Sequence, residues 1–550
     1  MNIYEQIYGS FARQDYGAAA DYITELQKKD ATEAARLKIS LYIEQGDSVQ
    51  AMTAWQELYK ILPNDFFTSF LHARIRFMEG RYVSAYKEIK GIVVPQNKQI
   101  GYGEKIANLL GQCSRILGKN QEAAIAYKRA AELASEPALQ ALEYSNYLFN
   151  LHYSGRHRAD FLREQASVFG QLVKQAQPFR HVRKKQRVKL RIGYMSADFR
   201  RHVCLCFCYD LLTAYDRDTF EVYVYMLGRE DEYSYSLQKQ VTAWRNLQGL
   251  PAQRSAQIIY EDEIDILVDL AGHTKGNGLP IMAYKPALVQ VSGIGYFAST
   301  GLPEVDYFLG DIYLDGARGE QSQQEFCEKL VILPQSHFCY RPLREVPLPQ
   351  TSPFRHNGYV TFGSFNNFAK VNDEVLITWC KILMAVPDSH LLLKAAVFDG
   401  GETENYMKKR MARLGLPMER VECRGISADY LPEYGDMDIA LDTFPYPGGG
   451  TSCDALYMGR PLITLAGSSH GERFGYSLLA NMGLGELVTH SVTDYIARAV
   501  LLASEEGLLQ GLHNNLRNIM QRSALRDSTS YMQNIEKAYH QMWKDCFKSL

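Results

Sequence analysis

Two patterns of hydrophobic and polar positions divide the chain. Through about residue 178, apolar residues recur with the spacing of amphipathic helices. From about residue 190, short apolar runs alternate with helical stretches, as strand–helix units with a parallel sheet require. The chain is therefore predicted to hold a helical region followed by an α/β region, joined by connecting helices and a basic linker over residues 136–188.

The helical region contains a repeat whose copies share few identical residues but have a regular spacing. Four stretches begin with a turn signal and reach a small residue five positions later. The stretches begin at Gln14, Gly46, Gly80 and Gly118, and the small residues are Ala19, Ala51, Ala85 and Ala123. The starts are 32, 34 and 38 residues apart, close to the tetratricopeptide period. We predict a tetratricopeptide-like domain over residues 1–135, whose concave face would bind polypeptide. An irregular helical bundle is the alternative.

The α/β region is predicted to form two parallel sheets. The first would contain the runs at residues 190–196, 220–227, 264–272 and 287–297. The second would contain the runs at residues 359–365, 390–396, 420–425, 438–444 and 461–467. The proline-rich stretch 340–354 would cross between them. These runs predict two doubly wound domains facing each other across a cleft, one over residues 189–345 and one over residues 346–550 that includes the C-terminal helices.

The composition is that of an ordinary soluble protein. The chain carries 60 basic and 62 acidic side chains, and 46% of its residues are hydrophobic. This balance gives no reason to expect nucleic acid or a membrane surface as a partner. The first residues lack a basic segment followed by an apolar one, and no stretch reaches the length of a membrane span. A cytoplasmic location is expected.

Polar side chains follow the strands of the second predicted sheet. Asn366, Asn367 and Lys370 come after the run at residues 359–365, while Ser427 and Tyr430 come after the run at residues 420–425. In open α/β sheets, ligands bind outside the carboxyl ends of the strands. These side chains are therefore expected to converge at one edge of the sheet.

A glycine loop, "GGGTSCD" at residues 448–454, follows another strand of that sheet. Its glycines, which would present bare N–H groups, are Gly448, Gly449 and Gly450. Thr451 would cap a helix, with Asp454 placed three residues on as in a capping box. A helix start suits an anion, and Lys370 would add a full positive charge. Asp454 would repel phosphate and is better placed to accept hydrogen bonds from sugar hydroxyls. The loop predicts a site for a nucleotide with its ribose; a tight turn before a capped helix is the alternative.

The first sheet offers candidate catalytic residues at two strand ends. His202 follows the opening strand, and Asp269 and His273 follow a later one. A histidine titrates near neutrality and can act as a general base or hold an acceptor group. A surface or hydrogen-bonded structural histidine is the alternative.

The sequence contains two groups of residues that resemble metal ligands, and we reject both as metal sites. Cys204, Cys206 and Cys208 alternate with apolar residues, and a helix with this spacing cannot gather three sulfurs around one zinc ion. The acidic pair Asp436 and Asp438 leads directly into a predicted strand. The site is expected to hold no metal and no cofactor.

Several blocks of the chain resemble one family. They read "LRIGYMSADFRRH", "LVDLAGHTKGNGLPIMAYKPALVQVSGIGYFASTGLPEVDYFLGD", "FGSFNNFAKVNDEVLITWCKILMAVPDSHLLLK" and "LDTFPYPGGGTSCDALYMGRPLITLAG". Behind the repeats, they resemble the O-linked N-acetylglucosamine transferases and SPINDLY-type proteins of glycosyltransferase family 41. The resemblance implies the GT-B fold of two Rossmann-like domains, the first on the acceptor side and the second on the nucleotide-sugar side. It also implies a metal-independent, inverting transfer from a nucleotide sugar to Ser or Thr hydroxyls of a protein recruited by the repeats.

The resemblance assigns roles to single residues. The family histidine that lies near acceptor and sugar matches His202, and the lysine that neutralises the diphosphate matches Lys370. Asn367 stands where a glutamine often contacts the nucleotide. The threonine of the phosphate loop matches Thr451, and the ribose-binding carboxylate matches Asp454.

The sequence departs from the family at two places. Gly449, Gly450 and Thr451 stand where the animal transferases carry His-Thr-Thr, and Tyr430 stands where a histidine packs against the base. UDP-N-acetylglucosamine is the favoured donor, with other UDP-hexoses and GDP-fucose left open. Resemblance to bacterial members implies a flagellar or surface protein as acceptor. The alternatives are a repeat-based adaptor with an inactive transferase half, and a transferase for small glycans whose repeats form a homo-oligomer.

Overall fold

The computed structural model describes residues 2–155, 157–181, 187–349 and 351–549. The chain separates into two compact units. The first is Met1–Asn150 with Gly400–Met407, and the second is Leu151–Asp399 with Lys408–Leu550. Residues 182–186 of the predicted basic linker lie outside the described residues.

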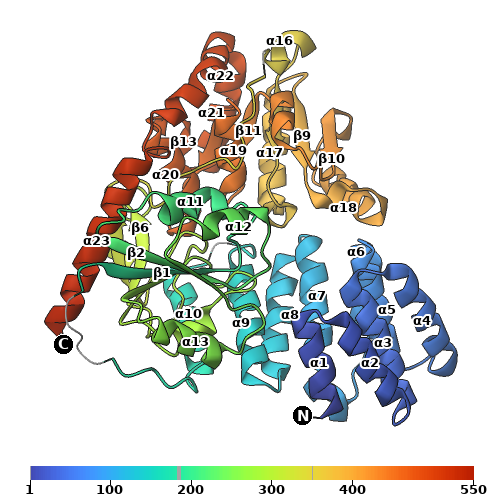
Figure 1. The fold of residues 1–550 in the computed structure, drawn as a ribbon. Coiled ribbons are helices and arrows are strands. Elements are labelled where there is room, and N and C mark those ends of the chain that lie inside the picture. Colours follow the sequence, from blue (N-terminus) through green and yellow to red (C-terminus); the bar gives the residue numbers. More distant parts are fainter. Residues whose placement is uncertain (1, 156, 182–186, 350, 550) are drawn as a thin grey trace. The chain divides into compact units, whose positions relative to one another are not determined.

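The first unit is a series of antiparallel helices, drawn in blue and cyan in Figure 1. Its helices are α1 (Ile3–Arg13), α2 (Tyr16–Gln27), α3 (Ala31–Gln45), α4 (Ser48–Ile61), α5 (Phe66–Met78), α6 (Tyr82–Gly91), α7 (Glu104–Ile116), α8 (Asn120–Leu133) and α9 (Pro137–Leu151). Consecutive helices pack against one another along the series. The unit thus continues one helix beyond the predicted end at residue 135.

The predicted turns join the helices in pairs. Four alanines lie where the second helix of each pair approaches the first, and all are fully buried: Ala19, Ala51, Ala85 and Ala123. Gly46, Gly80 and Gly118 end the preceding helices with φ of +77°, +75° and +73°, a conformation that glycine adopts without steric cost. The helical repeat region predicted from the sequence is confirmed.

The second unit contains a first sheet of seven parallel strands in the order β3-β2-β1-β4-β5-β6-β7. The strands are β1 (Leu190–Ser196), β2 (Phe220–Met226), β3 (Ala243–Asn246), β4 (Ile266–Asp269), β5 (Val289–Ser292), β6 (Tyr307–Asp311) and β7 (Lys329–Leu333). The four predicted runs contain β1, β2, β4 and β5. The two edge strands, β3 and β7, are partly exposed, so their sequences lack the continuous apolar run that identifies a central strand.

A second sheet of six parallel strands follows, in the order β10-β9-β8-β11-β12-β13. The strands are β8 (Thr361–Ser364), β9 (His390–Lys394), β10 (Val421–Arg424), β11 (Ile439–Leu441), β12 (Leu462–Leu465) and β13 (Val488–Thr489). The predicted runs contain every strand but β13, which has two residues. Each sheet is a Rossmann-like parallel sheet, as predicted.

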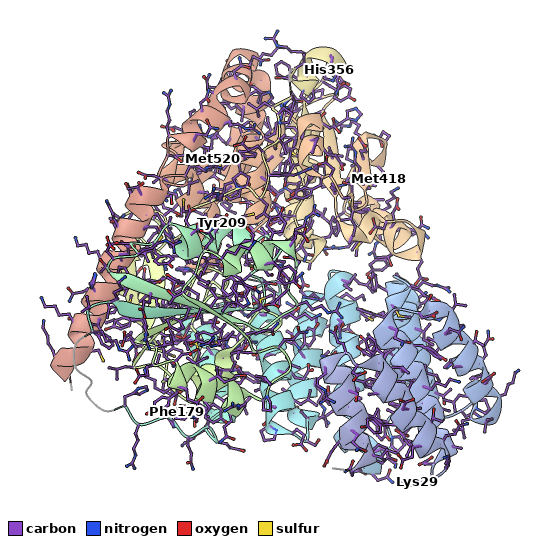
Figure 2. The ribbon with its side chains drawn as sticks, viewed as in Figure 1. Lys29, Phe179, Tyr209, His356, Met418 and Met520 are labelled. Carbon is purple, nitrogen blue, oxygen red and sulfur yellow. The ribbon has the colours of Figure 1, made fainter. Side chains whose placement is uncertain are left out.

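Further helices precede, separate and follow these strands along the chain. They are α10 (Ala159–Leu172), α11 (Leu205–Thr213), α12 (Glu232–Gln238), α13 (Ala252–Glu261), α14 (Leu279–Met282), α15 (Glu320–Gln323), α16 (Pro353–Asn357), α17 (Asp373–Ala385), α18 (Gly401–Arg413), α19 (Gly450–Tyr457), α20 (Phe474–Asn481), α21 (Val492–Ser504), α22 (Glu506–Gln521) and α23 (Ser528–Ser549). Figure 1 shows α11 and α13 on either side of β1 and β2. Phe179, labelled in Figure 2, stacks on Tyr260 of α13 with ring centroids 4.4 Å apart. This contact ties the segment before β1 to the outer layer of helices.

The last helix, α23, returns to the first sheet although it follows the second in sequence. The hydroxyls of Tyr539 on α23 and Tyr194 on β1 are 3.1 Å apart, and both rings are buried. The carboxylate of Glu536 accepts a hydrogen bond from the backbone N–H of Asp216 at 2.8 Å. The chain therefore crosses between the sheets twice, once after β7 and once before α23. The crossings meet where the N–H of Tyr340 donates to the carbonyl of Leu525 at 2.7 Å.

Among the described residues, no helix combines the length and the apolar character that crossing a membrane requires.

The repeat packing leads to a first prediction. Replacing Ala85 by leucine would add three carbons to a fully buried position on α6, and such overpacking costs about 1–3 kcal/mol. We expect the helical repeat unit to unfold at a lower urea concentration in this variant than in the wild type. Far-ultraviolet circular dichroism measures that transition. Val49→Leu is the control, because Val49 on α4 is exposed. Equal midpoints for the Ala85 variant and the wild type would contradict the close helix approach.

Candidate functional site

A buried carboxylate, Asp442, fixes the glycine loop at the end of β11. Its Oδ1 accepts hydrogen bonds from the N–H groups of Gly448 at 2.7 Å and Thr443 at 2.9 Å. Its Oδ2 accepts from the hydroxyl of Thr464 on β12 at 2.8 Å. Burial raises the pKa of Asp442 to about 6, which these bonds and Lys370 oppose. The loop is therefore held from beneath by a side chain that the sequence analysis did not select.

Two of the three glycines of the loop lie where a Cβ would clash with a neighbouring side chain. A Cβ at Gly450 would overlap the Cγ2 of Val203, which belongs to the first sheet's domain. A Cβ at Gly448 would overlap the hydroxyl of Ser452. The segment that carries His202 thus packs directly on the loop of the second domain. Gly450 is required here because the two domains approach too closely for a larger residue.

The helix after the loop begins two residues earlier than predicted. Helix α19 starts at Gly450 with Gly449 as its N-cap, and no side chain caps it. The prediction that Thr451 is the N-cap and that Asp454 completes a capping box is therefore wrong. Glycine is a common N-cap residue, and a Cβ at Gly449 would meet the ring of Phe474 at 3.4 Å, an ordinary van der Waals distance. The uncapped N–H groups of the first turn are left to a ligand or to water.

The hydroxyl of Thr451 instead faces the neighbouring strand end. It donates to the Oδ1 of Asn366 at 2.8 Å, and Asn366 is buried after β8. Asn367, the next residue, is exposed and accepts a hydrogen bond from the N–H of Ala369 at 3.1 Å. Ser427 lies farther out, where its hydroxyl donates to the carboxylate of Glu433. The structure thus joins Asn366 and Thr451 to the loop and leaves Asn367 and Ser427 at its margin.

Lys370 reaches the loop from the end of β8. Its Nζ donates to the carbonyl of Pro447 at 2.8 Å and lies 4.3 Å from the ring centroid of Tyr446. Burial lowers the pKa of Lys370 to about 8, and the charge of Asp442 opposes that shift. An ammonium group next to uncapped helix N–H groups is suited to an anion with more than one charge.

Asp454 lies one helical turn beyond the loop and is 6% exposed. Its Oδ1 accepts from the hydroxyl of Tyr340 at 2.6 Å, and its Oδ2 accepts from the hydroxyl of Tyr430 at 2.8 Å. Burial raises the pKa of Asp454 to about 6, while the two tyrosine hydroxyls lower it. Asp454 and Tyr430, which were expected at the same edge of the sheet, are therefore in contact. Tyr340 completes this hydrogen-bonded group, and the sequence analysis did not identify it.

His202 stands next to Val203, which contacts the loop. Its Nδ1 lies 3.3 Å from the N–H of Cys204 and 3.5 Å from Oδ2 of Asp198. Burial lowers its pKa, and Arg200 adds to that effect while Asp198 opposes it. An Nδ1 that accepts from a backbone N–H leaves the proton on Nε2. In this state the imidazole is neutral and offers a hydrogen-bond donor.

Asp269 and His273 are held inside the first domain. Asp269 accepts from the N–H groups of Ala271 and Gly272 and from the hydroxyl of Ser292. The Nε2 of His273 lies 3.0 Å from the carbonyl of Thr300, and burial lowers its pKa to about 3. Both side chains are fully buried, and their bonds support the loop that follows β4.

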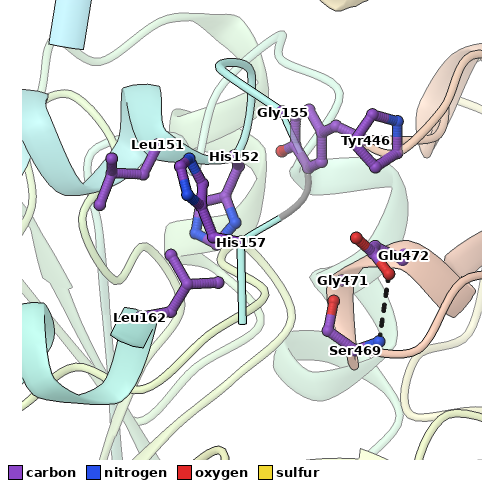
Figure 3. A pocket seen from close by; sticks show the side chains of 10 residues that line it. Leu151, His152, Gly155, His157, Leu162, Tyr446, Ser469, Gly471 and Glu472 are labelled. Carbon is purple, nitrogen blue, oxygen red and sulfur yellow. Dashed lines mark hydrogen bonds between the residues drawn. The ribbon is translucent and has the colours of Figure 1, made fainter. Parts of the chain in front are cut away.

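A pocket opens beside the glycine loop, shown in Figure 3. It has an empty volume of about 300 Å³ and is lined by Leu151, His152, Gly155, His157, Leu162, Pro445, Tyr446, Ser469, Gly471 and Glu472. The carboxylate of Glu472 accepts from the N–H of Ser469 at 3.2 Å. Burial lowers the pKa of His152 to about 4, so this imidazole is neutral at pH 7. The pocket combines apolar walls with neutral imidazoles and one carboxylate.

One group of described side chains has ligand atoms close enough to hold a metal ion, namely Asp198, His202 and Cys204. Burial raises the pKa of the Cys204 thiol, which keeps it protonated, and the backbone N–H of Cys204 already faces the Nδ1 of His202. A thiol and an occupied imidazole nitrogen are poor metal ligands. A site without metal stays a prediction.

The close approach at Gly450 leads to a second prediction. Gly450→Ala is expected to lower the free energy of unfolding by about 1–3 kcal/mol, because its Cβ would overlap Val203. Val203→Ala in the same chain should restore most of that loss, so the two changes would be non-additive in urea unfolding. Gly507→Ala is the control, since a Cβ there meets nothing within 4 Å. Additive effects of the two substitutions would contradict the contact.

The chain was compared with known proteins. The model of glycosyl transferase family 41 matches residues 152–341 and 354–535. The chain is 39% identical over 361 residues to a rice protein named probable UDP-N-acetylglucosamine–peptide N-acetylglucosaminyltransferase SPINDLY, covering 64% of this chain and 39% of that one. It is 30% identical over 368 residues to the Arabidopsis thaliana protein SEC, which carries the same enzyme name, covering 64% and 37%. The chain spans about two fifths of the length of these relatives.

A solved structure matches nearly the full chain. It is a mutant of the O-GlcNAc transferase of Thermobaculum terrenum, with a TM-score of 0.83 and 28% identity, covering 94% of this chain and 98% of that one. The chain therefore has helical repeats followed by two Rossmann-like domains, and it matches the GT-B fold of an O-GlcNAc transferase. The family model covers more than half of the residues, and the chain belongs to glycosyl transferase family 41.

Proposed function

We propose that this chain is a protein glycosyltransferase that moves a sugar from a nucleotide sugar to Ser or Thr hydroxyls of a polypeptide. The observation that carries the proposal is the order of groups along one edge of the second sheet. Tyr430 follows β10, Lys370 follows β8, the glycine loop follows β11 and the pocket residue Glu472 follows β12. This order suits a ligand with a nucleoside at one end, a diphosphate in the middle and a sugar at the other end.

The diphosphate would lie between Lys370 and the start of α19. Three uncapped N–H groups and one ammonium group would neutralise the charge that develops on the leaving nucleoside diphosphate. These groups are in place before the ligand arrives, because Asp442 fixes the loop and Pro447 holds the lysine. We propose that no metal ion is needed, since the charge is met by the chain's own donors.

The sugar would occupy the pocket of Figure 3. Tyr446 forms one wall of that pocket and also contacts Lys370, so a group attached to the diphosphate would reach it directly. The ring of Tyr446 can pack on the apolar face of a pyranose, and Glu472 can accept hydrogen bonds from its hydroxyls. Neutral imidazoles favour an uncharged sugar. UDP-N-acetylglucosamine is the donor we propose, in agreement with the names of the relatives.

The acceptor hydroxyl would approach from the side of His202. Its oxygen would form a bond to the anomeric carbon on the face opposite to the breaking bond, which inverts the configuration. The electrons of the broken bond would leave with the nucleoside diphosphate, and the hydroxyl proton would pass to solvent water. The Nε2–H of His202 would orient an acceptor or sugar oxygen by donating to it. The repeats of the first unit would recruit the polypeptide, with a flagellar or surface protein as the proposed acceptor.

Transfer is tested by intact mass. The purified chain is incubated with candidate polypeptides and, separately, with UDP-N-acetylglucosamine, other UDP-hexoses and GDP-fucose. We expect an N-acetylhexosamine increment on a polypeptide, and a rate loss of about 10²–10³ in Lys370→Ala, as when one donor to a developing anion is removed. Lys239→Ala, at an exposed position, is the control.

A fucose increment alone would overturn the proposed donor. Neither transfer nor donor hydrolysis with any sugar would overturn the transferase itself and favour an adaptor. Full activity in Lys370→Ala would remove the lysine from the diphosphate site.

The pKa of Lys370 predicts that nucleotide binding depends on pH. Its pKa of about 8 means that the ammonium form is lost as the pH rises through that value. If the charged form binds the diphosphate, the Kd for UDP should rise about tenfold for each pH unit above 8. Lys370→Arg stays charged and should show a flat profile over the same range. Calorimetric titration of UDP between about pH 7 and pH 9.5 measures both profiles, and a flat wild-type profile would contradict the assignment.

A further inference from the structure

Both oxygens of the Asp454 carboxylate accept hydrogen bonds from side chains of this chain. Each accepts one tyrosine hydroxyl, from Tyr340 at 2.6 Å and from Tyr430 at 2.8 Å. A buried carboxylate without partners is costly, so these two hydroxyls stabilise it. Asp454 is 6% exposed, so a ribose hydroxyl would reach the carboxylate most directly along the path that the Tyr430 hydroxyl occupies.

The two tyrosines differ in how firmly they are held. Tyr340 is 1% exposed, its N–H donates to Leu525, and its ring contacts Tyr457 with centroids 6.3 Å apart. It is fixed at the point where the two crossings between the sheets meet. Tyr430 is 38% exposed and stands at the start of a short 3-10 helix, Leu431–Asp436. Of the two tyrosines, Tyr430 is therefore the one whose hydroxyl can move away from Asp454.

The ring of Tyr430 meets Tyr434 edge-on with centroids 6.3 Å apart, while Tyr434 itself is buried and donates to the carbonyl of Thr451 at 3.0 Å. Tyr434 and the glycine loop are thus bonded to each other without Tyr430. Withdrawal of the Tyr430 side chain costs the hydrogen bond to Asp454 and the contacts of the covered part of its ring.

We propose that Tyr430 is a built-in substitute for ribose: its hydroxyl fills, in the empty protein, the position on Asp454 that a ribose hydroxyl takes in the complex. Tyr340 keeps the carboxylate oriented in both states and acts as a positioning residue. The inference rests on the proposed nucleotide site and adds to it a residue that sets the selectivity for ribose. In the wild type, a ribose hydroxyl only exchanges with the tyrosine hydroxyl, so ribose contributes little to net affinity.

The test uses nucleotides alone with the full chain. UDP and GDP are titrated by calorimetry into wild type and Tyr430→Phe, and the tighter nucleotide is compared with its 2′,3′-dideoxy form. We expect Tyr430→Phe to bind the ribonucleotide about tenfold more tightly than the wild type, because the ribose then supplies a missing partner to a buried charge. The dideoxy nucleotide should bind both proteins with similar Kd. Tyr235→Phe, an exposed tyrosine on α12, is the control and should match the wild type.

A second variant separates the role of Asp454 from a general change in the site. In Tyr430→Phe/Asp454→Ala, the ribonucleotide and its dideoxy form should bind alike. Tyr340→Phe should reduce the preference for ribose that Tyr430→Phe creates, when the two are combined. Equal or weaker ribonucleotide binding by Tyr430→Phe, with the wild type still binding, would overturn this inference and leave the proposed function intact. Failure of the wild type to bind either nucleotide would overturn both.

Discussion

The candidate site depends on one buried carboxylate, Asp442. It stands at the end of β11 and holds the N–H of Gly448 on one oxygen and the hydroxyl of Thr464 on the other. These bonds set the path of the glycine loop and so the direction in which α19 begins. The carbonyl of Pro447, fixed by the same path, holds the ammonium group of Lys370. The carboxylate of Asp442 therefore positions the loop on which the ammonium group of Lys370 rests, and its charge opposes the lowering of the pKa of that lysine.

The sequence predicted the parts of this site that follow from strand order. Lys370, Asn366 and Thr451 meet because parallel strands end at one edge, and that rule needs only the positions of apolar runs. The helical repeats were likewise visible, because a buried alanine and a left-handed glycine recur at a fixed spacing. Strands with exposed positions, such as β3 and β7, were missed because their burial is uneven.

The parts that the sequence did not predict are contacts between distant segments. Tyr340 and Asp454 are separated by 114 positions, and Val203 packs on Gly450 only because the two domains face each other. Thr451 was assigned the cap because Thr is a common N-cap residue, yet the helix begins earlier and Gly449 is its cap. The hydroxyl of Thr451 instead bonds to Asn366, a residue 85 positions away, and a local preference does not reveal such a contact. Asp442 carries a clear signal in hindsight, as a carboxylate at the last position of a buried strand before a glycine loop.

The double crossing between the sheets has a mechanical consequence. Two chain segments join the domains, and they are bonded to each other at Tyr340 and Leu525. This bond makes one joint of two connections that lie far apart in the sequence. The side chain at the joint also donates to Asp454. A shift of the joint would therefore act directly on that carboxylate, so the link between the domains and the proposed nucleotide site share one residue.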